Sequence, residues 1–370
     1  MNLKNILKVY NTYIHIPFCE NKCNYCDFTS FKISGNEDSK YVDYLLKEIS
    51  LYKKKYDLNV KQDTIYFGGG TPSLLSNNDL KRILSEFNYD ETTEITIEVN
   101  PKTTNKLKLK SYRELGINRL SIGVQSFNNK MLQILGRIHN SREAIRIYKE
   151  AKEVGFQNIS LDLMFALPKQ TLEDLKKDLK ELFDLEPEHF SIYSLIWEEG
   201  TNFYRDLMAG KLQETDNELE AEMYEFIINE AKEKNYIHYE ISNFAKENFE
   251  SRHNTIYWEN KNYLGLGLAA AGYLENKRYK NHTNFFNYYQ DLEGDKFPIS
   301  EEELLNSQEK EQYKYILGFR MLNKKIVADS EYKKKLEELF KEGYVEKIDE
   351  AYRITRKGLM LFNDFISNFI

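Results

Sequence analysis

The sequence has few cysteines and no long apolar runs, and each shortage narrows the kinds of protein that it can encode. Its three cysteines all lie between residues 19 and 26, so none is left over for disulfides and a cytoplasmic location is expected. No stretch approaches the ~18 apolar residues of a membrane-spanning helix. Residues 1–7 are too few and too polar for a secretory signal.

The sequence also has no excess of positive charge, with 52 basic against 59 acidic residues. The formal net charge of −7 argues against nucleic-acid binding, which depends on a basic surface. The lysine runs at residues 53–55 and 333–335 lie among glutamates in helical patterns, which is typical of solvated helix faces. With 370 residues, of which 41% are hydrophobic, the chain can form one large globular domain and a smaller one.

Apolar, β-rich runs alternate with amphipathic patterns through about the first 240 residues. Strands are predicted at residues 9–16, 64–67, 95–99, 119–123, 159–165 and 190–195. Helices are predicted at residues 39–56, 79–87, 107–115, 142–154, 172–185 and 218–234. Such a series predicts an α/β fold with a parallel sheet. Because six units close less of a circle than eight, we expect a partial (β/α)6 TIM-like barrel.

The pattern changes after residue 240. Residues 239–244, 252–258 and 264–273 look irregular or strand-like. Helices at 307–321 and 331–341, a hairpin around Asp349 and a last helix from about Thr355 resemble a winged-helix module. The acidic balance favours a lid or packing role for it over DNA binding. We therefore expect a core domain at 1–240, a connecting segment at 241–300, and a winged-helix-like domain at 301–370 within a C-terminal α+β extension.

Every cysteine lies in one C-x3-C-x2-C run, formed by Cys19, Cys23 and Cys26. A [4Fe–4S] cluster normally takes four cysteine thiolates, so three would leave one iron with an open position. An open position distinguishes a reactive metal site from a structural one. The alternatives are a zinc site, which would need a histidine such as His15 as a further ligand, and inert free thiols.

Other motifs follow the predicted strands, where the active sites of α/β barrels lie. The run Gly68-Gly69-Gly70-Thr71-Pro72 lacks the ending of a phosphate loop, and its exposed carbonyls suit an ammonium group. Glu98, Gln125 and Asp162 are isolated polar residues at further strand ends, and a carboxylate there is costly unless it is paired or bound to a ligand. Ribose hydroxyls would suit Glu98 and Gln125, and Arg137 could bind a ligand carboxylate. The alternative is internal salt bridges, such as Asp162 with Arg137.

In this order along residues 10–365, these motifs resemble the radical S-adenosylmethionine (SAM) superfamily, in its anaerobic coproporphyrinogen-III oxidase-like branch. The resemblance implies that Cys19, Cys23 and Cys26 hold a [4Fe–4S] cluster whose open iron binds S-adenosyl-L-methionine. It also implies a reductant such as flavodoxin or ferredoxin, whose electron leads to a 5′-deoxyadenosyl radical. The residues that it places around the methionine cofactor are Tyr13, Tyr25, Gly69, Gly70, Thr71, Glu98, Gln125, Arg137 and Asp162.

Two details favour the HemW-type haem chaperones within this branch. The coproporphyrinogen dehydrogenases carry a fourth cysteine where this chain has Phe28, and a long extension where this chain has 18 residues before Cys19. The run His253-Asn254-Thr255-Ile256-Tyr257-Trp258 also resembles that group. The resemblance implies haem as cargo, with His253 as a ligand and Tyr257 and Trp258 as flat neighbours; the alternative is that His253 is a core histidine.

Further expectations concern haem binding, partners and alternative enzymatic functions. The group often has a histidine in the small-residue run where this chain reads Ala269-Ala270-Ala271-Gly272. A haem-accepting partner is expected, and a homodimer or a peripheral membrane contact is left open. The enzymatic alternatives are oxidation of coproporphyrinogen III and modification or degradation of haem.

Overall fold

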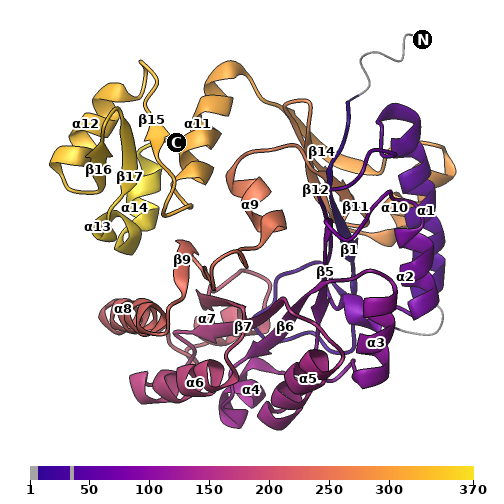
Figure 1. Ribbon diagram of the computed structural model, residues 1–370, viewed down its shortest axis with the longest axis horizontal. Helices are drawn as coiled ribbons and strands as arrows, with labels where there is room; N and C mark the ends of the chain where they lie inside the picture. Colours follow the sequence, from indigo (N-terminus) through magenta and orange to yellow (C-terminus); the bar gives the residue numbers. More distant parts are fainter. Residues whose placement is uncertain (1–6, 34–36) are drawn as a thin grey trace.

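A nine-stranded sheet forms the centre of the computed structural model, which describes residues 7–33 and 37–370 (Figure 1). Pairing is parallel from the first strand to the seventh in spatial order, and the last two are antiparallel additions at one edge. The spatial order is β11 (Leu264–Leu266), β1 (Asn11–Ile16), β4 (Thr64–Gly69), β5 (Glu94–Val99), β6 (Arg119–Gln125), β7 (Ile159–Phe165), β8 (His189–Ser194), β10 (Asn243–Ala245) and β9 (Ile237–Glu240). The predicted strands are confirmed, each end within two residues.

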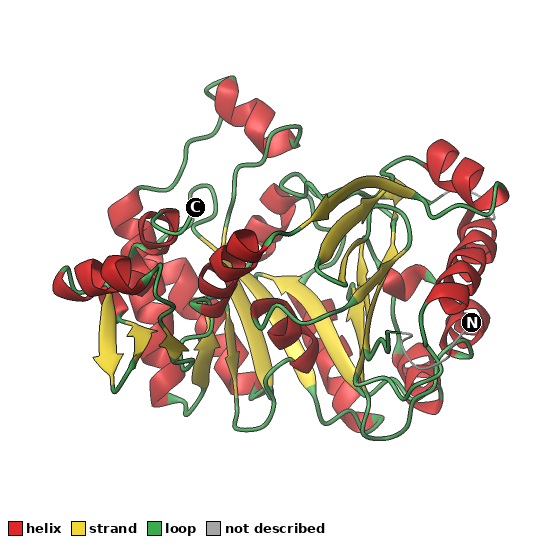
Figure 2. Cartoon of the chain, turned by 90° about the horizontal axis from the view of Figure 1, so that it is seen from above, coloured by secondary structure: helices red, strands yellow, loops and turns green. Residues whose placement is uncertain are grey.

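Helices connect these strands and cover the outer face of the sheet, which curves as an open row (Figure 2). Capping explains where two of them begin: Asn140 and Thr171 each form a capping box with the carboxylate three residues later. The predicted helices are confirmed, and two short ones, α4 and α7, lie in loops. The helices are α1 (Glu37–Lys55), α2 (Asn77–Leu84), α3 (Lys106–Glu114), α4 (Asn129–Leu135), α5 (Ser141–Glu153), α6 (Leu172–Leu185), α7 (Asn202–Met208) and α8 (Asn217–Glu233).

The segment after the barrel differs from the prediction at one point. Residues 252–258, expected to be irregular or strand-like, form helix α9 (Arg252–Trp258). The Ser251 side chain caps this helix by accepting a hydrogen bond from the Asn254 N–H. The aromatic and β-branched residues after Ser251 favour a strand in sequence-based prediction, so the helix was not expected. A three-stranded antiparallel sheet and helix α10 (Phe285–Glu293) follow; its strands are β12 (Ala271–Leu274), β13 (Lys277–Asn281) and β14 (Ile299–Leu304).

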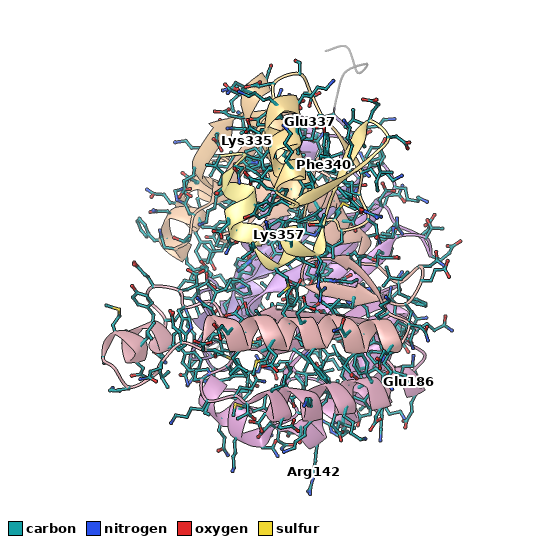
Figure 3. The ribbon with its side chains drawn as sticks, turned by 90° about the vertical axis from the view of Figure 1, so that its left-hand side faces the viewer. Arg142, Glu186, Lys335, Glu337, Phe340 and Lys357 are labelled. Carbon is teal, nitrogen blue, oxygen red and sulfur yellow. The ribbon has the colours of Figure 1, made fainter. Side chains whose placement is uncertain are left out.

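The C-terminal part has a hydrophobic core of its own, which includes Tyr315, Phe319 and Phe365. The predicted hairpin is confirmed as an antiparallel pair of strands, β16 and β17. We propose that the domain boundaries lie at residues 240 and 300. Figure 3 places this C-terminal unit, with the labelled Lys335 and Phe340, at the opposite end of the molecule from Arg142. Its elements are α11 (Ser307–Gly318), β15 (Ile326–Val327), α12 (Lys333–Lys341), β16 (Val345–Ile348), β17 (Ala351–Ile354), α13 (Arg356–Met360) and α14 (Phe362–Ser367).

Within the described ranges, no helix is both long enough and apolar enough to cross a membrane. The expectation that residues 1–7 are not a secretory signal concerns a segment of which residues 1–6 lie outside the described part of the chain.

Candidate cofactor site

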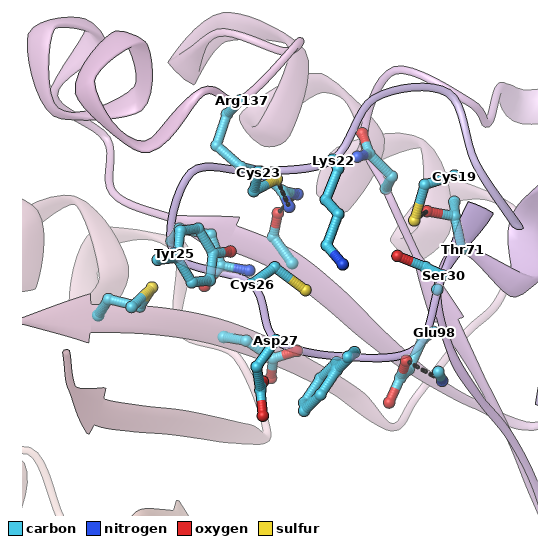
Figure 4. Close-up of a pocket in the computed structure, with 18 of the residues that line it drawn as sticks. Cys19, Lys22, Cys23, Tyr25, Cys26, Asp27, Ser30, Thr71, Glu98 and Arg137 are labelled. Carbon is cyan, nitrogen blue, oxygen red and sulfur yellow. Dashed lines mark hydrogen bonds between the residues drawn. The ribbon is translucent and has the colours of Figure 1, made fainter. Parts of the chain in front are cut away.

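The carboxyl ends of the parallel strands meet at one edge of the sheet and enclose a cavity of about 380 Å³ (Figure 4). Strand register explains the convergence: Glu98 pairs with Ser121, and Asp162 pairs with Gly123 on one side and Ser191 on the other. The volume suits a small-molecule ligand. Most of the predicted site residues line this cavity, namely Cys19, Cys23, Cys26, Tyr25, Gly69, Gly70, Thr71, Glu98, Gln125, Arg137 and Asp162.

The cysteine thiols receive hydrogen bonds from two of these residues. Thr71 Oγ1 lies 3.4 Å from Cys19 Sγ, and Arg137 Nη1 lies 3.6 Å from Cys23 Sγ. Burial raises the pKa of Cys26 to about 11, so a thiolate there needs a metal or a cation to stabilise it. Lys22 reaches toward the space between the sulfurs in Figure 4 and lowers the pKa of Cys26.

The cysteine loop is anchored at Asn24, which the sequence analysis did not single out. The backbone N–H of Asn24 donates to Leu135 O at 3.0 Å, and its side-chain amide donates to Ile134 O at 2.8 Å. Its backbone carbonyl accepts the Phe203 N–H at 2.9 Å. One asparagine therefore joins the loop to the end of α4 and the start of α7.

The two buried carboxylates are held without a salt bridge. Glu98 accepts from Tyr66 Oη at 3.0 Å and from the Gly69 N–H at 3.1 Å, and burial raises its pKa to about 7. Asp162 accepts from Ser121 Oγ at 2.7 Å and from Ser160 Oγ at 3.0 Å, and burial raises its pKa as well.

The alternative pairing of Asp162 with Arg137 is therefore wrong. Arg137 donates instead to Gly123 O at 2.7 Å, while its Nε is buried with no partner. A buried donor without a partner is costly, and a ligand carboxylate would satisfy it.

Gln125 ends β6 in a left-handed conformation, with φ at 67°. The register between β6 and β7 shifts at this point, and Tyr193 Oη donates to Gln125 Oε1 at 3.0 Å. Positive φ is uncommon for a residue with a side chain and is concentrated at functional sites. The bulge turns the Gln125 side chain toward the cavity.

The three consecutive glycines at the end of β4 are required by packing as well. A Cβ on Gly68 would lie 2.9 Å from the Tyr13 ring, one on Gly69 2.5 Å from the His15 ring, and one on Gly70 2.6 Å from Phe18 O. Gly69 also has φ at 111°. The loop lies flat against β1, which leaves its backbone on the cavity wall.

Comparison with known proteins places this site in a family. Residues 13–182 match the model of the Radical SAM superfamily. The chain is 37% identical to the haem chaperone HemW of Bacillus subtilis, over 97% of this chain and 99% of that protein. It is 34% identical to the haem chaperone HemW of Lactococcus lactis, over 98% of each chain. The chain belongs to the HemW family.

Among solved structures, the coproporphyrinogen III oxidase HemN of Escherichia coli superposes with a TM-score of 0.86. The match covers 99% of this chain and 91% of that one at 21% identity, so it establishes a shared fold. The barrel and the C-terminal extension of this HemW-family chain are both part of that fold.

The motif shared with the HemW-type group, residues 253–258, lies away from the cofactor cavity. His253 is 0% exposed, and both ring nitrogens are engaged: Nδ1 lies 2.7 Å from Thr64 Oγ1, and Nε2 lies 2.7 Å from Tyr257 Oη. Its ring stacks on Tyr66 at 5.1 Å. In this conformation no nitrogen of His253 is available to haem iron, so the structure favours the alternative of a core histidine.

Tyr13 also lies outside the cofactor cavity. Its hydroxyl is 3.0 Å from His15 Nδ1, and the two side chains share a face of β1. Tyr13, Tyr257 and Trp258 line a different cavity.

Sequence reasoning missed several residues that line the cofactor cavity. The end of β8 contributes Tyr193 and Leu195, β7 contributes Met164, and the cysteine loop contributes Lys22 and Ser30. The position of residues 191–197 at a strand end predicts that this segment lies near the cavity, but it does not predict which of its side chains line the cavity.

The donor set fits a [4Fe–4S] cluster. Three thiols line one cavity wall, hydrogen-bond donors face two of them, and Arg137 has a free buried donor nearby. The described residues contain no compact group of three or more His, Cys, Asp and Glu side chains that could enclose a single ion. In a cluster each thiolate binds a separate iron, so the three sulfurs need not converge on one ion.

Proposed function

We propose that this chain is a haem chaperone, which binds haem and transfers it to acceptor proteins, and that it carries a [4Fe–4S] cluster and S-adenosyl-L-methionine. The observation that supports this most strongly is the extent of the similarity to the two proteins named haem chaperone HemW. It spans 97% and 98% of this chain, and so includes the barrel, the connecting segment and the C-terminal unit.

Under this proposal, most of the predicted residues of the cofactor cavity bind or orient the cluster or the methionine cofactor. Cys19, Cys23 and Cys26 would hold the cluster, which when bound supplies an electron for cleavage of the sulfonium. Arg137 donates to the methionyl carboxylate, and the backbone at Gly69 and Gly70 accepts from its ammonium group.

The remaining residues orient the nucleoside half. Glu98 and Gln125 accept from ribose hydroxyls, and Asp162 fixes the serines beside them. Tyr25, packed at 6.5 Å from Phe203, shields the cysteine loop from solvent. Flavodoxin or ferredoxin would serve as the reductant.

Anaerobic reconstitution tests the cluster assignment. The wild type should bind about four irons per chain, and Cys23→Ala should lose both the iron and the binding of S-adenosylmethionine. Glu20→Gln, a change to an exposed residue of the same loop that does not line the cavity, is the matched control and should keep both. Unchanged iron content in Cys23→Ala would overturn the site.

Two further measurements test the chaperone role. Addition of haem to the reconstituted protein should give a saturable Soret band, and incubation with apo-acceptor should transfer that haem. With coproporphyrinogen III, S-adenosylmethionine and reductant, no protoporphyrinogen should form. Its formation would show that the chain is a dehydrogenase.

A further inference from the structure

A second cavity, of about 580 Å³, lies beside the cofactor cavity. Asp27 and Phe28 line both cavities, so one short segment of the cysteine loop forms the wall between them. Aromatic rings form much of the second cavity, with Tyr257 and Tyr263 packed edge to face at 4.6 Å and Trp258 beside them. Phe28 is 60% exposed and lines both cavities, so its ring is available to a flat ligand.

The same cavity gathers positive charge. Lys261, Arg278 and Lys280 line it with Asp27 as the one carboxylate among the described lining residues, although the chain as a whole has a net charge of −7. Strand alternation places Arg278 and Lys280 on the same face of β13. Tyr279, between them, points the other way and packs against Gly272, where a Cβ would lie 2.2 Å from its ring.

The cationic groups differ in how far they are already engaged. Lys261 pairs with Glu259 at 2.5 Å. Arg278 donates to Asn260 Oδ1 at 2.8 Å and stacks over the Tyr313 ring at 4.0 Å, but its Nε is buried with no partner. Stacking holds the guanidinium in place, so it can donate to an anion at little further entropic cost.

We propose that this second cavity binds a flat, largely apolar molecule that carries carboxylates, and that Lys261, Arg278 and Lys280 bind those carboxylates. The inference rests on the proposed function, under which the ligand is haem with its two propionates. Aromatic side chains suit the macrocycle, and guanidinium and ammonium groups suit the propionates. The two histidines at or near the cavity, His15 and His253, have both ring nitrogens engaged, so charge and stacking provide the recognition.

Haem titrations of the full-length reconstituted protein, followed by the Soret band, test this site. The double variant Lys261→Gln/Lys280→Gln changes two exposed side chains, and Arg278→Gln changes the stacked one. We expect each to weaken haem binding by roughly tenfold, the scale of one charge-assisted hydrogen bond. Lys277→Gln is the matched control, because Lys277 lies on the opposite face of β13 and pairs with Glu302.

Haem dimethyl ester separates charge recognition from general apolar binding, since it lacks the propionate charges. It should bind the wild type and the double variant equally. Wild-type affinity for haem in both the double variant and Arg278→Gln would overturn the inference while leaving the chaperone role intact. Absence of haem binding to the wild type would instead overturn the proposed function.

Discussion

At the scale of single residues, His253 is the clearest case of a side chain whose environment sets its chemistry. Burial lowers its pKa from 6.5 to about 3. The His253 imidazole takes up a proton near pH 6.5 in the unfolded chain but only near pH 3 in the folded chain. Its contribution to the free energy of unfolding is therefore complete above pH 6.5 and is lost as the pH falls toward 3.

Replacement of His253 by Gln tests that sign. The wild type should be more stable at neutral pH, and its advantage should shrink by about 1.4 kcal/mol per pH unit as the pH falls. Urea unfolding at a series of pH values between about 6 and 4 measures the difference. A difference that does not change with pH would contradict a neutral, buried imidazole.

Ala271 offers the opposite test, a gain of function. It is exposed, and it lines the second cavity. Imidazole is a common iron ligand in haem proteins, so Ala271→His should tighten haem binding by roughly tenfold, or about 1.4 kcal/mol, and shift the Soret band. Lys296→His, at an exposed position that does not line the cavity, should change neither. Equal spectra for both variants would place haem elsewhere.

Sequence reasoning correctly placed in one cavity those residues whose position follows from spacing or from a strand end. The cysteine triad and Glu98 are of this kind, because a polar residue that ends a parallel strand reaches the same edge as its neighbours. It could not resolve His253, whose partner Thr64 lies 189 residues away. It also placed Tyr13 beside the methionine cofactor, whereas Tyr13 lines the second cavity. The sequence of β1 shows which residues share a face with Tyr13, but it does not show which cavity that face lines.

At the scale of elements, the six long strands of the barrel were predictable and the three-residue strands were not. β7 is a continuous apolar run apart from its serine and aspartate, which is typical of a strand covered on both faces. By contrast, β10 and β11 have three residues each, too few for a periodic signal. They join the sheet because β8 and β1 present free edges to them.

The cysteine loop shows how an element is held in position without regular structure. Asn24→Ala removes two side-chain hydrogen bonds, one that Asn24 donates to Ile134 O and one that it accepts from Asn202 Nδ2. We expect about 1–2 kcal/mol less stability and faster loss of iron to a chelator. Asn21→Ala is the control, because Asn21 is exposed and makes one side-chain bond, to Gly136 O at 3.2 Å. Equal rates of iron loss would mean that Asn24 does not hold the loop.

At the scale of the whole molecule, the junction between the barrel and the C-terminal unit passes through the HemW-type motif. The Arg320 guanidinium stacks over the Trp258 ring at 4.3 Å. Burial raises the pKa of the Glu240 carboxyl, and the positive charge of Arg320 partly opposes this shift. Beside it, the Leu322 N–H donates to Tyr239 O at 3.0 Å. Trp258 also lines the second cavity, so the position of the C-terminal unit and the shape of that cavity depend on the same contact.

Arg320→Ala should therefore affect both stability and haem binding. Removal of the guanidinium takes away both the stacking on Trp258 and the charge that opposes the burial cost of Glu240, which together we expect to cost about 1–2 kcal/mol, and it frees Trp258 to move into the cavity. Denaturant unfolding and the haem titration measure the two effects. Arg320→Lys keeps the charge but loses the planar stacking, so it should recover more of the stability than of the haem affinity. If it restores both equally, the charge alone positions the C-terminal unit and the stacked tryptophan has no part in shaping the cavity.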